Sequence, residues 1–140
     1  MRKDAVKAIR ELLKGNARNL ESIIRFLQGD DDAVRSGYVK EWAWQVLKRA
    51  TLTERQKERL RRVAEGYLKR RLRREFWYMC RFIWRIPDST FNARVEQLTR
   101  SKDEAVRQRA ALLYAYLQGP EIGARVHREF RSQYWRSTRK

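Results

Sequence analysis

The sequence predicts an all-α protein, a stack of antiparallel helical hairpins with about six helices, arranged as a short solenoid or as a helical bundle. Apolar residues recur three and four positions apart along the chain, and no run alternates strictly as a half-buried strand would. A chain of 140 residues is long enough to form one hydrophobic core but too short to form two comfortably. We therefore expect a single domain over residues 1–135 and a basic C-terminal tail over residues 136–140.

The first two segments predict a helical hairpin. Residues 2–14 place their apolar side chains on one face and stop at Gly15, which accepts the left-handed conformation of a helix cap. Residues 17–28 repeat this pattern before Gly29. Two short helices joined by a tight turn pack against each other.

A third helix is predicted to begin after three aspartates, Asp30, Asp31 and Asp32. Adjacent carboxylates without spaced partners are better suited to capping a first turn than to binding a cation. The apolar face expected for this helix consists of Val34, Tyr38, Val39, Trp42, Ala43, Val46 and Leu47.

Residues 54–86 keep helical spacing throughout, which predicts one long helix or two helices with a bend near Gly66. Residues 51–54 provide its start signal, and residues 87–89 end it because proline restricts the residue before it. Short helices then carry the apolar residues of 91–98 and 106–117. Gly119 and Pro120 separate the latter from a last helix.

Two parts of the chain are similar at an offset of 72 residues, which aligns residues 31–35 (DDAVR) with residues 103–107 (DEAVR). Half of this offset is close to the period of helical-hairpin repeats, so a divergent hairpin fits in between. Residues 101–113 (SKDEAVRQRAALL) resemble the HEAT-like repeat pattern of a short helix, an acidic turn and a second helix. The resemblance covers about half the chain and implies an α-solenoid. An ordinary bundle with two similar aspartate-capped helices is the alternative.

Positive charge dominates the composition. The chain has 34 Lys and Arg against 17 Asp and Glu, a net charge of +17, yet 42% of its residues are hydrophobic, which disordered basic tails do not reach. Arginine outnumbers lysine by 25 to 9, and its planar guanidinium matches phosphate or carboxylate. Residues 51–86 hold +8 of the excess, and residues 87–120 only +1. We therefore expect a folded protein with an anionic partner.

Basic and aromatic side chains in the middle of the chain recur three and four positions apart, opposite the apolar stripe. They are Arg70, Arg73, Arg74, Trp77, Arg81, Trp84 and Arg85. Such a face suits nucleic acid, with arginine on the phosphates and tryptophan on an unpaired base. The other interpretation is that both tryptophans pack in the core and the arginines extend past them.

The C-terminus supplies a second basic element beside Tyr134 and Trp135. Its candidate phosphate contacts are Arg125, Arg128, Arg131 and Arg136. Cations near the end of a helix also complement its dipole, which explains part of this pattern without a ligand.

Residues for catalysis are scarce. His127 is the one histidine and Cys80 the one cysteine, and no Gly-rich phosphate loop or Gly-x-Ser-x-Gly motif is present. We therefore expect no enzymatic activity, no cofactor and no metal site, with His127 at the surface or the edge of the core and Cys80 as a small buried hydrophobe.

The single cysteine and the lack of an apolar leader favour a reducing, cytoplasmic location. The longest nearly apolar run, residues 76–86, is interrupted by Arg81 and Arg85, so no membrane span is expected.

These observations predict a non-enzymatic protein that holds DNA or RNA by the phosphate backbone, without base-specific readout, and that could be a small subunit of a nucleoprotein complex. A second hypothesis is a helical-repeat adaptor that binds an acidic protein partner, with Trp44, Trp77 and Trp135 as exposed anchors. A third is attachment of the 55–86 helix to an anionic membrane surface.

The HEAT-like resemblance leaves one enzymatic alternative. Some HEAT-like proteins are DNA glycosylases, which use an aspartate and tryptophans against an alkylated nucleotide. Trp84 and Asp88 supply these residue types, although a cap on the following helix explains Asp88 fully.

Overall fold

The computed structural model describes residues 1–29 and 34–138, and for Val34 and residues 133–138 it describes the backbone alone. The described chain contains eight α-helices, one short 3₁₀ helix (Leu47–Arg49) and no strand, so the all-α prediction is confirmed. The helices are α1 (Arg2–Leu13), α2 (Leu20–Gln28), α3 (Val34–Val46), α4 (Glu54–Leu68), α5 (Phe76–Ile83), α6 (Ser89–Leu98), α7 (Glu104–Gln118) and α8 (Pro120–Thr138). The expected caps at Asp30, Asp31 and Asp32 lie outside the described residues.

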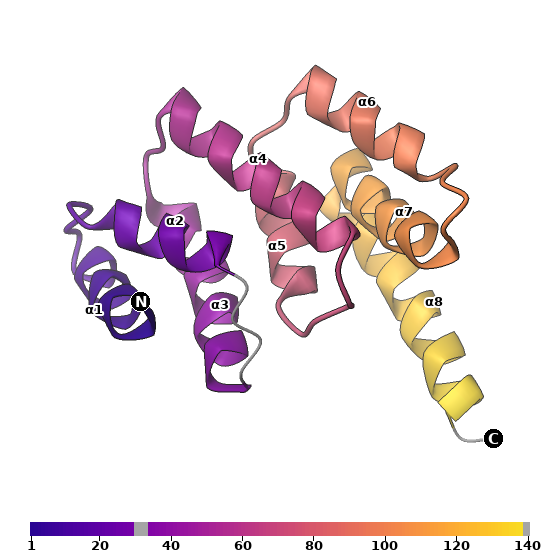
Figure 1. Ribbon diagram of the computed structural model, residues 1–140, viewed down its shortest axis with the longest axis horizontal. Helices are drawn as coiled ribbons and strands as arrows, with labels where there is room; N and C mark the ends of the chain where they lie inside the picture. The colour runs from indigo at the N-terminus through magenta and orange to yellow at the C-terminus, as the bar shows by residue number, and fades with distance from the viewer. Residues whose placement is uncertain (30–33, 139–140) are drawn as a thin grey trace.

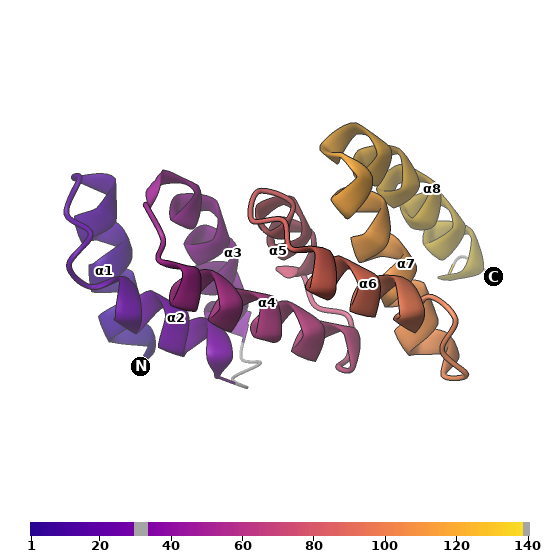
Figure 2. The ribbon, with the colours of Figure 1, turned by 90° about the horizontal axis from the view of Figure 1, so that it is seen from above.

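The helices lie in two layers, and the two chain termini stand at opposite ends of the molecule (Figures 1 and 2). In one layer α1, α3, α5 and α7 follow one another, each packed against the next. On the other side α2 packs against α4, and α6 continues the same row. The last helix, α8, packs along α7 and ends the stack.

Side-chain caps begin three of the helices. The Thr53 hydroxyl accepts the backbone N–H of Gln56 at 3.1 Å, and the Gln56 side chain accepts the N–H of Thr53 at 2.9 Å, which is a capping box at the start of α4. The carboxylate of Asp88 accepts the N–H of Phe91 at 2.8 Å and caps α6. Asp103 caps α7 in the same way. The start predicted at residues 51–54 and the cap predicted at Asp88 are thereby confirmed.

Glycines end two helices as expected and a third differently. Gly15, with a φ of 88°, and Gly119, with a φ of 148°, follow α1 and α7 in a conformation that favours glycine. Gly29 follows α2 with a φ of −71° and a ψ of 157°, an extended backbone open to any residue, so the left-handed cap predicted there is wrong. Its carbonyl instead accepts a hydrogen bond of 3.1 Å from Lys40, whose side chain is buried.

Of the alternatives predicted for residues 54–86, one long helix or two with a bend near Gly66, the structure has two helices, but the boundary between them does not lie at Gly66. Residues 69–75 form a loop between α4 and α5, and Gly66 lies inside α4. The hydroxyl of Tyr67 donates to the carboxylate of Glu75 at 3.1 Å, and Glu75 is only 1% exposed. Gly37 gives the loop room, because a Cβ there would lie 3.3 Å from the Cδ of Arg74. These tertiary contacts override the local helical preference of the loop.

Without a continuous helix over residues 55–86, the proposed membrane-surface attachment loses the element on which it depended. Within the part of the chain that the structure describes, no helix has the length and apolar character needed to cross a membrane.

The apolar face predicted for the third helix is only partly correct. Ala43, Val46 and Leu47 are buried as expected, but Tyr38 is 53% exposed and Trp44, which was expected to be exposed, is fully buried. The reason is that α3 contacts α1, α2 and α5, and a helix surrounded by neighbours carries apolar residues on several sides. The Trp44 ring lies 5.5 Å from Phe82 and 6.4 Å from Tyr67, where α3, α4 and α5 meet.

Several arginines join the helices to one another. The guanidinium of Arg59 in α4 pairs with Glu21 in α2, and Arg94 in α6 pairs with Glu65 in α4 at 2.6 Å. Arg109 in α7 donates to the last carbonyl of α4 at 2.9 Å. Part of the arginine content therefore stabilises the fold through contacts between helices.

Candidate nucleic-acid interface

The structure divides the predicted binding residues among three places. Arg70, Arg73 and Arg74 lie in the loop before α5, Trp77 and Arg81 lie in α5 with Trp84 and Arg85 directly after it, and Arg125, Arg128 and Arg131 lie in α8. The prediction of one helical face with alternating guanidinium and indole groups is therefore wrong. The prediction fails because the loop at residues 69–75 interrupts the helical spacing between α4 and α5.

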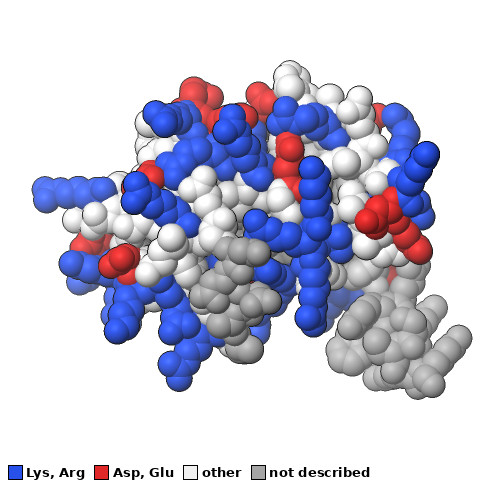
Figure 3. Space-filling view, in the orientation of Figure 1, with Lys and Arg blue, Asp and Glu red and all other residues white. Residues whose placement is uncertain are grey.

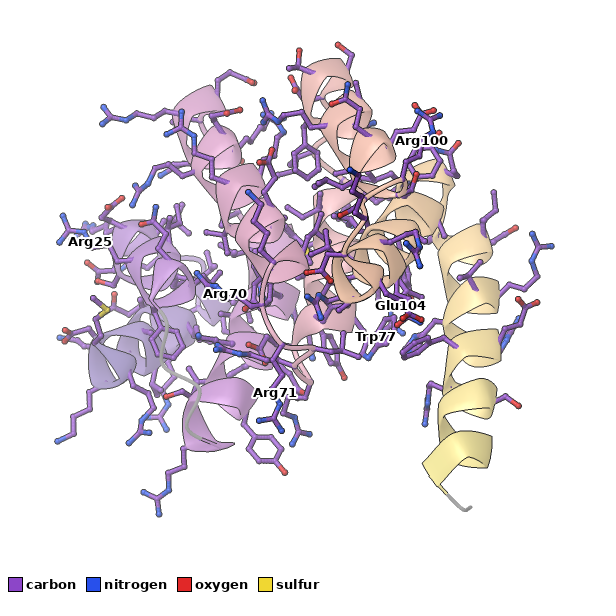
Figure 4. The ribbon with its side chains drawn as sticks, turned by 45° about the vertical axis from the view of Figure 1, so that its right-hand side comes forward. Arg25, Arg70, Arg71, Trp77, Arg100 and Glu104 are labelled. Atoms are coloured by element: carbon purple, nitrogen blue, oxygen red, sulfur yellow. The ribbon has the colours of Figure 1, made fainter. Side chains whose placement is uncertain are left out.

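The loop arginines take part in contacts within the protein. The Arg74 guanidinium lies 3.7 Å from the centre of the Tyr38 ring and 2.5 Å from the Glu41 carboxylate, and these groups raise the pKa of Arg74. Arg70 lies over the ring of Tyr67 at 6.0 Å. Figure 4 shows Arg70 together with its exposed neighbour Arg71 on this loop.

Trp77 is a packing residue. Its ring points from α5 toward α8 (Figure 4), where it stacks on His127 with ring centroids 3.5 Å apart. The ring of Phe130 lies 5.9 Å away on the same helix. Of the two interpretations of the predicted tryptophans, packing is the one that Trp77 follows.

His127 is 8% exposed and is therefore buried among α5, α7 and α8, not at the surface. The Tyr116 hydroxyl lies 3.2 Å from its Nδ1. Burial, together with the positive charges of Arg131 and Arg81, lowers the pKa of His127 to about 4. The imidazole is therefore neutral at neutral pH, and its ring packs between α5 and α7.

The arginines of α8 have exposed side chains at positions 125, 128 and 131. The helix continues to Thr138, which includes the first three residues of the expected tail. The side chains of Arg136, Tyr134 and Trp135 lie outside the described residues.

Trp84 is 40% exposed at the C-terminal end of α5, and Asp88 uses its carboxylate to cap α6. Cys80 is fully buried, as predicted, and burial raises the pKa of its thiol. In the described segments no three His, Cys, Asp or Glu residues form a group that could hold a metal ion.

A groove with a volume of about 590 Å³ lies between α3 and α5. We call it the basic groove, and it is lined by Leu13, Trp42, Gln45, Val46, Lys48, Arg49, Tyr78 and Arg81. One wall comes from α3 and the 3₁₀ helix, and the other comes from α5. Three of these residues are cations, two are half-buried aromatics and none is acidic.

A smaller hollow of about 250 Å³ adjoins the basic groove at Lys48, which lines both. Its lining includes Lys57 and Arg85. The Arg85 guanidinium donates to the carbonyl of Lys48 at 3.5 Å. The cationic surface therefore extends from the groove toward the start of α4.

The cations of the basic groove repel one another. Partial burial and the nearby charges of Arg85 and Arg81 lower the pKa of Lys48. Neither Lys48 nor Arg49 forms a salt bridge with any described residue. An anion in the groove would relieve this repulsion, because an opposite charge stabilises the protonated amine.

Cations also cover other parts of the surface. Figure 3 shows Lys and Arg across the whole width of one face, with Asp and Glu in smaller, separate groups. An open hollow beside α1 is lined by Arg2, Lys3, Val6, Lys7, Arg10, Glu11 and Lys14. That hollow contains a carboxylate and no aromatic ring, and in both respects it differs from the basic groove.

Sequence reasoning identified Arg81 and Arg85 but not Trp42, Lys48 or Tyr78. Trp42 was assigned to an apolar face, and a basic pair at the end of a helix is explained by the helix dipole. The sequence contains one indication of this wall of the groove: residues 42, 45 and 49 follow helical spacing and therefore share a face. The opposite wall is contributed by α5, which follows some thirty residues later in the chain and is placed only by the fold.

Three comparisons with known proteins gave no match to this chain, whether against protein-family models, curated proteins or solved structures. The HEAT-like resemblance therefore rests on the sequence pattern alone.

Proposed function

We propose that this chain is a non-enzymatic nucleic-acid-binding protein that holds DNA or RNA by the phosphate backbone, with the basic groove at the centre of its binding surface. One observation carries the proposal: the groove brings Lys48, Arg49 and Arg81 together and has no carboxylate in its lining. The small, repeat-like helical stack would serve as the scaffold that holds the two walls of the groove.

The charge of the groove suits a polyanion better than a single small anion. Arg85 and Lys57 continue the positive surface beyond the groove through the adjoining hollow. A phosphodiester chain presents a negative charge at every step, so neighbouring phosphates can meet neighbouring cations and release condensed counterions. The net charge of +17 adds a long-range attraction that speeds the encounter.

The adaptor hypothesis receives less support from the arrangement of aromatic residues. Trp44 is fully buried and Trp77 stacks on His127, so two of its three expected anchors are used inside the protein. The third, Trp135, has a side chain outside the described residues. An acidic protein is the competing partner, and polyglutamate represents it in the test below.

The test measures the binding of labelled single-stranded and double-stranded oligonucleotides by fluorescence anisotropy over a series of salt concentrations. Replacing Lys48, Arg49 and Arg81 together with Gln should weaken binding. For each phosphate that the variant no longer neutralises, the salt slope should fall by about 0.9 on duplex DNA or about 0.7 on a single strand. These side chains are exposed, so the variant should keep its thermal stability.

A matched control removes the same number of charges from the other layer. Arg25, Arg62 and Arg100 are exposed and pair with Glu21, Glu58 and Glu96, and their change to Gln should leave the salt slope nearly intact. Equal losses in both triple variants would point to general surface charge and overturn the assignment to the groove. Failure of every oligonucleotide to bind, or equally tight binding of polyglutamate, would overturn the proposed function.

A further inference from the structure

We infer that the basic groove takes a single strand, and that Trp42 and Tyr78 are the surfaces on which its unpaired bases stack. This inference rests on the proposed function and names the form of nucleic acid that the groove selects.

The two aromatic side chains belong to opposite walls. Trp42 comes from α3 and Tyr78 from α5, and both line the groove. Each packs in part against the hydrophobic core and remains partly exposed. Packing restricts the movement of the rings, so a base that stacks on them loses little additional side-chain freedom.

Cations flank the aromatic surfaces on both sides. The Arg81 guanidinium lies 5.5 Å from the centre of the Tyr78 ring. On the other wall, Lys48 and Arg49 follow Trp42 within two helical turns. Aromatic rings between positive charges meet the two needs of an unpaired strand, since charge tracks its backbone and rings receive its exposed bases.

A duplex would gain less from this arrangement. Its bases are stacked and paired inside, so it would offer the groove mainly phosphates, and the two aromatic rings would contribute little. The groove volume of about 590 Å³ is within the range of pockets that enclose small organic molecules, so an unpaired base with its sugar can enter. The α1 hollow, which is basic but lined by no aromatic ring, has no comparable reason to prefer a single strand.

The decisive experiment uses the unaltered protein and three probes of equal length: a thymidine strand, an abasic strand with the same sugar-phosphate backbone, and a duplex. Binding is measured for all three at one fixed salt concentration. The thymidine strand should bind about 5-fold to 150-fold more tightly than the abasic strand for each base that stacks. Stacking is thereby separated from charge, because the two strands carry the same phosphates.

Variants then assign the effect to residues. Tyr78→Leu and Trp42→Leu should each reduce the preference for the thymidine strand over the abasic strand, while Trp42→Phe should keep most of it. Tyr38→Leu is the matched control, because Tyr38 is 53% exposed but does not line the groove. Thermal melting identifies any variant that fails to fold. In that case the probe comparison with the unaltered protein still decides whether unpaired bases stack, and the variants that fold decide the residue assignment.

The outcomes separate this inference from the proposed function. Equal binding of the thymidine, abasic and duplex probes, with the expected salt dependence, would overturn the stacking inference and leave backbone binding in place. A loss of preference in Tyr38→Leu and not in Tyr78→Leu would move the stacking site to Tyr38 in α3, beside Arg74, and overturn the assignment. Absence of binding to all three probes would overturn both proposals.

Discussion

His127 of α8 lies flat on Trp77 of α5, with ring centroids 3.5 Å apart and an angle of 12° between the ring planes. The next residue in α5, Tyr78, lines the basic groove instead. Successive positions of this short helix thus serve different purposes, one joining the C-terminal helix to the stack and the other facing the groove. The short helix α5 therefore connects the integrity of the fold to the shape of the candidate site.

The buried stack predicts a pH dependence of stability. The unfolded chain binds a proton on His127 near pH 6.5, whereas the folded pKa is about 4. Between these values the unfolded state holds more protons, so stability is complete above about pH 6.5 and falls as the pH drops toward 4. Urea unfolding at several pH values, together with NMR titration of this one histidine, measures both quantities.

His127→Phe is the control for this dependence, since it keeps a flat ring on Trp77 but cannot titrate. The pKa of Glu21 is lowered by its hydrogen bond to Arg59, so its contribution is lost only below its ordinary value of 4.5. The interval from about pH 5 to 6.5 consequently lies above the titration of Glu21 and within that expected for His127. A folded-state midpoint near pH 6.5 would show that the imidazole is not held in the buried stack.

The contact between α7 and α8 predicts that Gly123→Ala is destabilising. A Cβ at Gly123 would lie 2.8 Å from the Cα of Tyr116 and closer still to its ring, so the two helices would have to separate. We expect a loss of about 1–3 kcal/mol in the free energy of unfolding, measured by urea denaturation. Gly66→Ala in α4 is the matched control: a Cβ there would lie 3.5 Å from its nearest neighbour, the Arg70 guanidinium, and the change should raise the free energy of unfolding by about 0.5–1 kcal/mol. Equal effects of both changes would contradict the close approach.

Arg61 is predicted to hold the segment between α5 and α6 in place. Its side chain is buried, and its guanidinium donates to the carbonyls of Ile86 at 3.0 Å and of Pro87 at 3.4 Å. Arg61→Met should cost about 1.5–3 kcal/mol, because the carbonyls then have no charged donor to bind. Arg62→Met changes an exposed neighbour and should cost at most about 0.5 kcal/mol in the same denaturation assay.

Trp44 and Trp84, the most buried and the most exposed of the tryptophans whose side chains the structure describes, give a prediction for the core. Trp44→Ala should destabilise the protein by about 3–5 kcal/mol, because it empties the space between Tyr67 and Phe82. Trp84 is 40% exposed, and Trp84→Ala should change the free energy of unfolding by no more than about 0.5 kcal/mol. Calorimetry on the two variants compares them directly, and a stable Trp44→Ala variant would contradict the burial of this ring.

The features that local chemistry specifies were predictable from the sequence. The cap of α4 at Thr53, the cap of α6 at Asp88 and the helix ends before Gly15 and Gly119 each depend on a few neighbouring residues. The buried state of Cys80 follows from its apolar surroundings in the sequence. Each of these features can be predicted from the residues of a single helical turn, without reference to residues farther along the chain.

The features that depend on contacts between residues far apart in the chain were not predictable from the sequence. The break at residues 69–75 accompanies the burial of Glu75 beside Tyr67 and the space at Gly37, and no helical pattern records those contacts. Tyr38 and Trp44 have opposite exposures to those expected, because α3 has neighbours on several sides. Apolar spacing identifies a helix face reliably only when a single side of the helix is covered.

By itself, the sequence determined the all-α class, the helix boundaries marked by caps and the excess of positive charge, because composition and local backbone chemistry are written within each segment. The tertiary structure decided which cations face one another. It pairs Arg74 with Glu41 and Arg59 with Glu21, and it leaves Lys48, Arg49 and Arg81 around a groove without a carboxylate. Charge acts through space across helices far apart in the chain, so only the fold separates the arginines that pair with carboxylates from the cations that line the groove.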